Sequence, residues 1–150
     1  IAEGNTSIDE DKVALKDAES VCCSSPVLLK ARLLYDGGYY DKAFNQIIVF
    51  DQIDQIDNIE YWYRLARIKS KLNFKNNEII AHYQKSYDLG KALTAYYAPM
   101  SALQIALIYE NQNKLDKAAI YFEKCLSMSG FDYEIGIHQN ARSGLVRISD

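Results

Sequence analysis

The sequence predicts an all-α fold in which antiparallel helical hairpins stack side by side. Three observations support this prediction. Apolar residues recur at helical spacing over most of the chain. The tripeptide Asp-Lys-Ala occurs twice, each time just after a turn-like segment. Only seven Gly and two Pro interrupt the 150 residues, which favours long helices over many short strands and turns.

The clearest hairpin lies between Ala102 and Leu126. Its first helix has apolar residues at Ala102, Ile105, Ala106 and Tyr109, the i, i+3, i+4, i+7 pattern of a helix face. A polar break over residues 110–114 follows, which is typical of a short turn between two helices. The second helix is indicated by a further apolar set, Leu115, Ala118, Ala119, Phe122, Cys125 and Leu126.

The same register recurs upstream, over residues 26–47. Ala31 and Ala43 stand twelve residues apart, as Ala106 and Ala118 do. Small residues at these positions let two helix axes approach to about 8–10 Å. Gly37-Gly38 provides a left-handed turn between the helices, and Asp-Lys-Ala opens the second helix in both copies. This recurrence predicts a second hairpin.

A third, less regular copy is marked by Trp62, Leu65, Ala66, Tyr83 and Ser86. Its turn over residues 73–77 carries about one extra residue, a departure from the other two copies. Ile79 or Ile80 stands where the other copies have Ala, so we expect this hairpin to be looser.

The clearest hairpin has a small residue on its first helix and another small residue twelve positions later, followed by an aromatic and a further small residue. This order resembles the tetratricopeptide repeat. The resemblance implies a right-handed superhelix of stacked hairpins, an α-α solenoid, along the whole chain. The copies start 35 and 40 residues apart, against a usual period of 34, so residues 89–99 should extend a helix or hold a longer connection. We expect one domain that comprises a partial repeat 8–25, repeats 26–58, 59–98 and 99–130, and a closing helix 134–149.

Composition limits the partners and the compartment. The formal net charge of −3 argues against nucleic acid, which requires a strongly basic face, and no apolar run approaches the roughly 18 residues that span a bilayer. Three cysteines, Cys22, Cys23 and Cys125, form no disulfide framework, and we expect Cys125 to be buried. A reducing, cytoplasmic location fits best. The chain begins at Ile1 and not at Met, so an exported or membrane-anchored parent protein is also compatible.

No motif for catalysis, metal or cofactor binding is evident, and we expect no enzyme activity and no cofactor. His82 is interpreted as a surface or partly buried structural residue, and His138 as a helix-start residue. The alternating acidic run Asp51–Asp57 lacks the mid-loop Gly and the closing Glu of a calcium loop.

The resemblance implies that the first helices line a concave face. Arg32, Arg67 and Arg142 each follow the small residue of a first helix. A guanidinium fork beside aromatic rings suits the carboxylates of an acidic or C-terminal peptide. The alternative is that these are solvated charges, or partners for Asp and Glu of the chain itself. The candidate peptide-binding residues are Arg32, Tyr35, Tyr63, Arg67, Lys71 and Arg142.

Aromatic residues form a second candidate surface. Tyr61 and Tyr96 are candidates for exposed rings that could stack on a ligand, whereas Trp62 is expected to pack between helices.

Two functions are compatible with these features. The first is a protein-interaction module that binds an extended peptide or a helix of a partner protein in the concave groove. The alternative is a structural or assembly segment of a longer solenoid or oligomer, with possible self-association through the exposed face of the N-terminal partial repeat.

Overall fold

The computed structural model describes residues 25–50 and 58–150. Over these ranges the chain forms seven helices and no strand, so the predicted all-α solenoid is confirmed. The helices are α2 (Pro26–Asp36), α3 (Tyr40–Ile47), α5 (Ile59–Lys71), α6 (Asn76–Gly90), α7 (Tyr97–Asn111), α8 (Leu115–Leu126) and α9 (Glu134–Ser149). Some of the expected features lie outside the described residues. These are Cys22, Cys23, the acidic run Asp51–Asp57, and all of the expected partial repeat 8–25 except its last residue.

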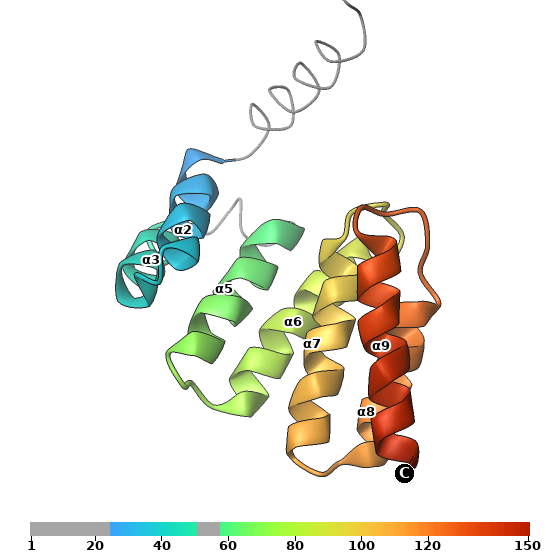
Figure 1. The fold of residues 1–150 in the computed structure, drawn as a ribbon. Coiled ribbons are helices and arrows are strands. Elements are labelled where there is room, and N and C mark those ends of the chain that lie inside the picture. The colour runs from blue at the N-terminus through green and yellow to red at the C-terminus, as the bar shows by residue number, and fades with distance from the viewer. Residues whose placement is uncertain (1–24, 51–57) are drawn as a thin grey trace, which may run out of the picture.

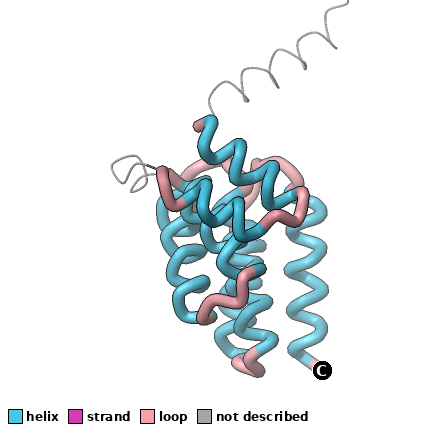
Figure 2. The backbone as a smooth tube through the Cα atoms, turned by 90° about the vertical axis from the view of Figure 1, so that its left-hand side faces the viewer, coloured by secondary structure: helices cyan, strands magenta, loops and turns pink. Residues whose placement is uncertain are grey.

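The helices pair into hairpins that stack in chain order (Figure 1). α2 packs with α3, α5 with α6, and α7 with α8, and each following first helix packs on the hairpin before it. The two helices of each hairpin run antiparallel and are joined by a short loop (Figure 2). Successive first helices α2, α5, α7 and α9 also contact one another, and in the described part of the chain successive second helices make no comparable contact. The first helices therefore line the inner side of the curved stack.

The turns within the three hairpins share one backbone geometry. Gly38, Asn73 and Asn113 each lie seven residues after the small residue of the first helix, and each has a positive φ, of 81°, 57° and 56°. In each turn the next amide nitrogen donates a hydrogen bond back to a first-helix carbonyl, at 2.8, 3.1 and 2.9 Å. Gly and Asn are the residues that adopt this left-handed conformation most readily at a helix end.

Small residues mark the crossing of the two helices in each hairpin. Ala31 and Ala43 lie in one core cluster, and Ala106 and Ala118 lie in another; all four are fully buried. In the middle hairpin Ala66 shares its cluster with Ile79, so Ile79 and not Ile80 takes the place of the second Ala. Each cluster combines one hairpin with the next first helix, and the core is therefore built in overlapping units along the stack.

The connection from α6 to α7 accounts for the irregular spacing of the repeats. α6 continues to Gly90, α7 begins at Tyr97, and Pro99 lies in the first turn of α7, where its missing N–H costs no hydrogen bond. The extra length is therefore shared between a longer helix and a connection over residues 91–96.

α9 packs in a register one residue away from the expected one. In α7, Ile105 packs against the preceding hairpin, and the next residue, Ala106, packs against α8. In α9, Ala141 packs in the cluster formed by the preceding hairpin α7–α8. Ala141 thus corresponds to Ile105, and Arg142 corresponds to the small residue Ala106.

None of the described helices is both long enough and apolar enough to span a bilayer.

The tight contact between α8 and α9 at Gly144 gives a test of the packing. A Cβ atom added at Gly144 would lie 2.2 Å from the ring of Phe122, which is fully buried. Gly144→Ala should therefore lower the free energy of unfolding by about 1–2 kcal/mol, because overpacking outweighs the better helix propensity of Ala. Urea unfolding measures this change.

Gly136 on the same helix is the matched control, because a Cβ there would meet nothing within 4 Å. Gly136→Ala should raise the free energy of unfolding by about 0.5–1 kcal/mol. Equal effects of the two substitutions would contradict this packing of α9.

Candidate functional site

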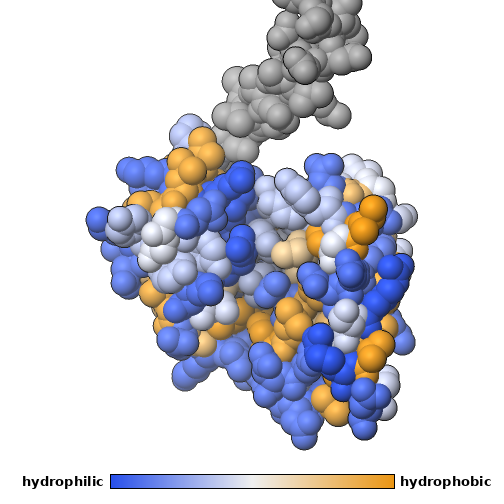
Figure 3. Space-filling model, in the orientation of Figure 1, coloured by the Kyte–Doolittle hydropathy of each residue, from blue (hydrophilic) through white to orange (hydrophobic). Residues whose placement is uncertain are grey.

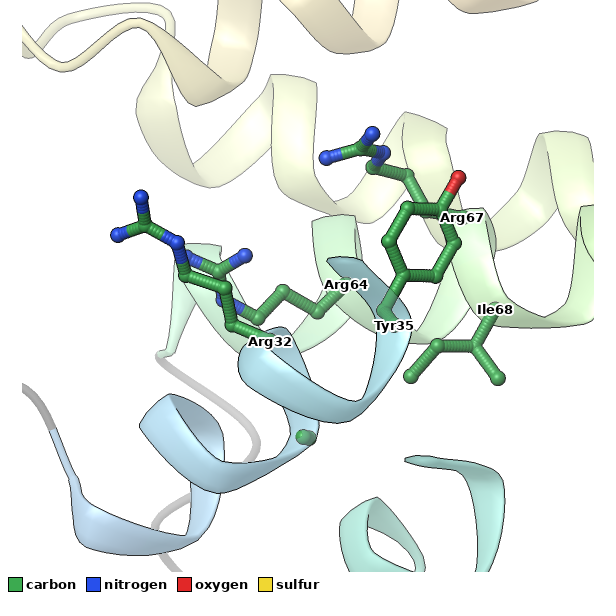
Figure 4. A pocket seen from close by; sticks show the side chains of 6 residues that line it. Arg32, Tyr35, Arg64, Arg67 and Ile68 are labelled. Carbon is green, nitrogen blue, oxygen red and sulfur yellow. The ribbon is translucent and has the colours of Figure 1, made fainter. Parts of the chain in front are cut away.

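Arg67 of α5 lies over two tyrosine rings on the inner side of the stack. Its guanidinium carbon is 4.4 Å from the centroid of the Tyr35 ring of α2 (Figure 4). It is 5.6 Å from the centroid of the Tyr63 ring. Burial alone would lower the pKa of Arg67, but the neighbouring Tyr63 and Tyr35 outweigh it and the pKa is raised. No ion pair joins Arg67 to a carboxylate of the described residues. Arg67 is therefore a charged, preoriented group without an anionic partner in this part of the chain.

Two further arginines flank the Tyr35 ring. Arg32 of α2 pairs with Asp36 at 3.6 Å, and both side chains are about half exposed. Arg64 of α5 is buried and donates from Nε to Glu60 at 2.5 Å. Burial opposes the charge of Arg64, yet the Glu60 carboxylate outweighs that effect and raises its pKa. Arg32 and Arg64 line the same pocket as Tyr35 (Figure 4).

These side chains line a small pocket between α2 and α5, together with Ala31 and Ile68. Its cavity volume is about 10 Å³, roughly enough for one water molecule. A side-chain carboxylate could enter only if a lining residue moved. The Arg32 side chain is 54% exposed and makes a surface ion pair, which contributes little energy, so it is the residue that can move most easily.

The local sequence explains this convergence. Arg32 and Arg67 each directly follow the small residue of a first helix, Ala31 or Ala66, and α2 packs along α5. Residues at equal register on adjacent first helices therefore come to lie beside each other on the inner face. Tyr35 lies one turn after Ala31, and this position brings its ring under Arg67.

The other predicted site residues lie in different surroundings. Lys71 is exposed at the end of α5, with its Nζ 5.9 Å from the Tyr40 ring. Tyr63 is only 1% exposed, and burial raises its pKa to about 12, so its ring supports Arg67 from within the core. Arg142 is exposed on α9, where its hollow is lined only by α9 residues. Arg32, Tyr35 and Arg67 are thus brought together, and Arg142 is not part of their group.

Arg64 was not among the predicted residues. It lies where a first helix meets the preceding hairpin, a position that a charge rarely occupies. The sequence feature that could have identified Arg64 is Glu60, four residues earlier. This spacing places both side chains on one face of a helix.

The expected exposed aromatic surface is only partly present. Tyr61 is buried and stacks on Phe50 with ring centroids 5.6 Å apart, so the prediction that it is exposed is wrong. The reason is that Tyr61 belongs to the face by which α5 packs on the preceding hairpin. Tyr96 is half-buried against Tyr97, Tyr63 and Tyr133, and Trp62 is half-buried and stacked on His82.

His82 is a partly buried structural residue, as expected. Its ring stacks on Trp62 at 5.4 Å, its Nε2 lies 3.1 Å from Lys69 Nζ, and its buried Nδ1 has no hydrogen-bond partner. Lys69 also binds Glu78. Burial and the charge of Lys69 lower the pKa of His82 to about 4.

His138 and Cys125 are buried. His138 lies one turn inside α9 and places its Nε2 2.9 Å from the Met128 carbonyl oxygen, so its interpretation as a helix-start residue is wrong: α9 begins earlier, at Glu134. Cys125 is fully buried as predicted, and burial raises its pKa to about 12. In the ranges that the structure describes, no group of three His, Cys, Asp or Glu residues could hold a metal ion.

Stacked helical hairpins with an inner face lined by first helices define a helical-repeat solenoid. Residues 101–132, which include most of α7 and all of α8, match the tetratricopeptide repeat family. The crystal structure of PcrH in complex with the chaperone binding region of PopD is similar to this chain, with a TM-score of 0.70 and 13% sequence identity over 95% of each chain. No curated protein sequence matches.

Residues 101–132 therefore carry a tetratricopeptide repeat, as the sequence predicted, and the similarity to PcrH supports the same type of fold over the chain. The hairpin that matches the family, α7–α8, is also the one in which the small residues Ala106 and Ala118 are followed by Phe122 and Cys125.

The lowered pKa of His82 predicts a pH dependence of stability. The folded protein keeps His82 neutral, whereas the unfolded chain binds a proton below the ordinary pKa of 6.5. The unfolded state therefore binds more protons as the pH falls, and stability should decrease by up to about 2 kcal/mol between pH 6.5 and 5.

Chemical denaturation at several pH values measures this decrease. His82→Gln should remove most of it in this window, which lies above the range in which carboxylates titrate. An unchanged pH dependence in the variant would show that His82 is not its source.

Proposed function

We propose that this chain is a protein-interaction module that binds an extended or helical segment of a partner protein along its inner face. Acidic side chains of that segment contact Arg32, Arg67 and Lys71. The observation that carries the proposal is Arg67, a guanidinium held over two tyrosine rings and without a carboxylate partner among the described residues.

The surroundings of Arg67 favour a carboxylate over other ligands. The pocket between α2 and α5 combines three guanidinium groups with two carboxylates, Asp36 and Glu60, and is therefore net positive. A guanidinium is weakly hydrated and offers a planar fork of donors that fits a carboxylate. Because the Tyr35 ring already holds Arg67 in place, little conformational entropy is lost when a ligand binds.

The inner face changes in character along the stack, which suggests how a ligand is oriented. The position that holds Arg32 and Arg67 in the first two hairpins holds Leu107 in α7, where the side chain is half-buried. Farther on, Glu110 is neutralised by two hydrogen bonds from Arg147, at 2.8 and 2.9 Å. An acidic part of the ligand is therefore expected at α2 and α5, and an apolar part at α7. Apolar patches interrupt the hydrophilic surface on the side shown in Figure 3.

The similar fold of PcrH supports a role in protein binding, because that structure contains the chaperone binding region of PopD. Solenoids in general bind partners along their concave surface. The proposal for this chain rests on that general property together with the arginines of its own inner face.

A structural or assembly role is the second candidate. Leu33, Ile48 and Val49 are exposed at the α2–α3 end of the stack, and exposed apolar side chains at the end of a solenoid favour contact with a further element.

The proposal predicts that Arg67→Gln combined with Lys71→Gln weakens the binding of acidic peptides. Short labelled peptides that contain glutamate and leucine serve as probes, and the same peptides with glutamine in place of glutamate show whether charge is needed. Fluorescence anisotropy should give a Kd about tenfold or more higher for the double variant, since a hydrogen bond to a charged group contributes about 1.5–3 kcal/mol.

Lys124→Gln is the matched control. Lys124 lies on α8, a second helix, with its Nζ 4.4 Å from the Tyr121 ring and 5.4 Å from the Tyr87 ring, an arrangement like that of Arg67 but on the outer layer. The control should bind with unchanged Kd. Equal loss in both variants, or no preference for glutamate over glutamine peptides, would contradict the proposal.

A further inference from the structure

Arg64 carries hydrogen-bond donors that no group of the described chain uses. Its side chain is only 6% exposed, and its Nε donates to Glu60 at 2.5 Å. Neither of its two terminal nitrogens donates a hydrogen bond to the part of the chain that the structure describes. Burying a charged group is costly unless its donors are satisfied. Because Arg64 lines the pocket between α2 and α5, these donors are available to a group that enters the pocket (Figure 4).

The charge and the size of this pocket limit what can enter it. Three guanidinium groups line it, and the carboxylates of Asp36 and Glu60 pair with two of them. One positive charge remains, which a single carboxylate would neutralise. The cavity of about 10 Å³ holds roughly one water molecule, so a carboxylate requires a smaller opening than the bulkier phosphate group. A carboxylate can also accept two parallel hydrogen bonds from one guanidinium.

We infer that one carboxylate side chain of the partner segment inserts into this pocket, where it binds the unused donors of Arg64 together with Arg67. The inference rests on the proposed function and deepens it, since it makes the buried Arg64 the residue that recognises the inserted group. The exposed cations Arg32 and Lys71 then attract the acidic segment, and Arg64 selects a carboxylate within it.

Insertion requires Arg32 to move. Its Nε lies 3.6 Å from the Asp36 carboxylate, and the two side chains are 54% and 52% exposed. An exposed ion pair of this kind contributes little stability, so Arg32 can exchange Asp36 for the carboxylate of the ligand. Asp36 therefore competes with the ligand for Arg32, and its removal should strengthen binding.

Insertion also depends on the shape of the Arg64 side chain and not only on its charge. In the arginine fork, Nε pairs with Glu60 while the terminal nitrogens remain for the ligand. A lysine ammonium is a point charge on a flexible stem, and at this position it would pair with Glu60 without offering a second, planar set of donors. Attraction between charged surfaces alone would not distinguish arginine from lysine at residue 64.

Fluorescence anisotropy with the 150-residue chain tests the role of Arg64. The probes are labelled peptides of leucine and glutamine with one central glutamate, and matched peptides with glutamine or phosphoserine in its place. Arg64→Lys should raise the Kd of the glutamate peptide about tenfold, because hydrogen bonds to a charged group are lost. It should leave the Kd of the glutamine peptide unchanged. The phosphoserine peptide should bind the unmodified protein more weakly than the glutamate peptide does.

Asp36→Asn provides a second, independent test at an exposed residue. This substitution should lower the Kd of the glutamate peptide about twofold to threefold, because Arg32 is released from its surface pair. Asp41→Asn is the matched control, since Asp41 is an exposed carboxylate on α3 and does not line the pocket. The control should bind with unchanged Kd.

The outcomes separate this inference from the proposed function. Equal Kd values of the glutamate and glutamine peptides for the unmodified protein would contradict both. A glutamate preference that Arg67→Gln with Lys71→Gln reduces but Arg64→Lys leaves intact would support the proposed function and overturn insertion. Urea unfolding shows whether Arg64→Lys is folded; if it is not, an unchanged Kd in Asp36→Asn overturns the inference. Tighter binding of the phosphoserine peptide than of the glutamate peptide would also overturn it.

Discussion

The close approach of two helices at a pair of buried residues determines the rest of this structure. Ala31 with Ala43 and Ala106 with Ala118 are fully buried in the cores of their hairpins. A larger side chain at these positions would separate the helix axes, and the next first helix could then no longer pack on both members of the hairpin. The same contact fixes the inner face, because the residue after each small Ala points away from the crossing and toward the concave side.

Most of the fold could be predicted because its signals are local and repeat. A small residue followed twelve positions later by another specifies a hairpin, and Gly38, Asn73 and Asn113 specify its turn. The register of α9 could not be read in the same way. Elsewhere a small residue in a first helix marks the contact with a following second helix, whereas Ala141 is small because α9 packs closely on the preceding hairpin. Both contacts select Ala, and sequence alone does not distinguish them.

The candidate site was less predictable, because its members depend on which face of a helix meets a neighbour. Arg32, Tyr35 and Arg67 were identified from their distance to the small residues, and the structure brings them together. Tyr63 lies at an inner position by the same count but is covered by the rings of Tyr83, Tyr96 and Tyr97. A stack of large rings fills the space between hairpins there, and its extent depends on packing across repeats that no single repeat reveals.

We propose that the inner face of the first helices is the binding surface. The most direct measurement is a map of backbone amide chemical shifts by NMR, recorded while a glutamate- and leucine-containing peptide is added. The largest chemical-shift changes are expected in α2, α5 and α7, centred on Arg67, and the changes should decrease toward α9. Shifts concentrated in α3, α6 and α8 would contradict it, because those second helices form the outer layer of the stack.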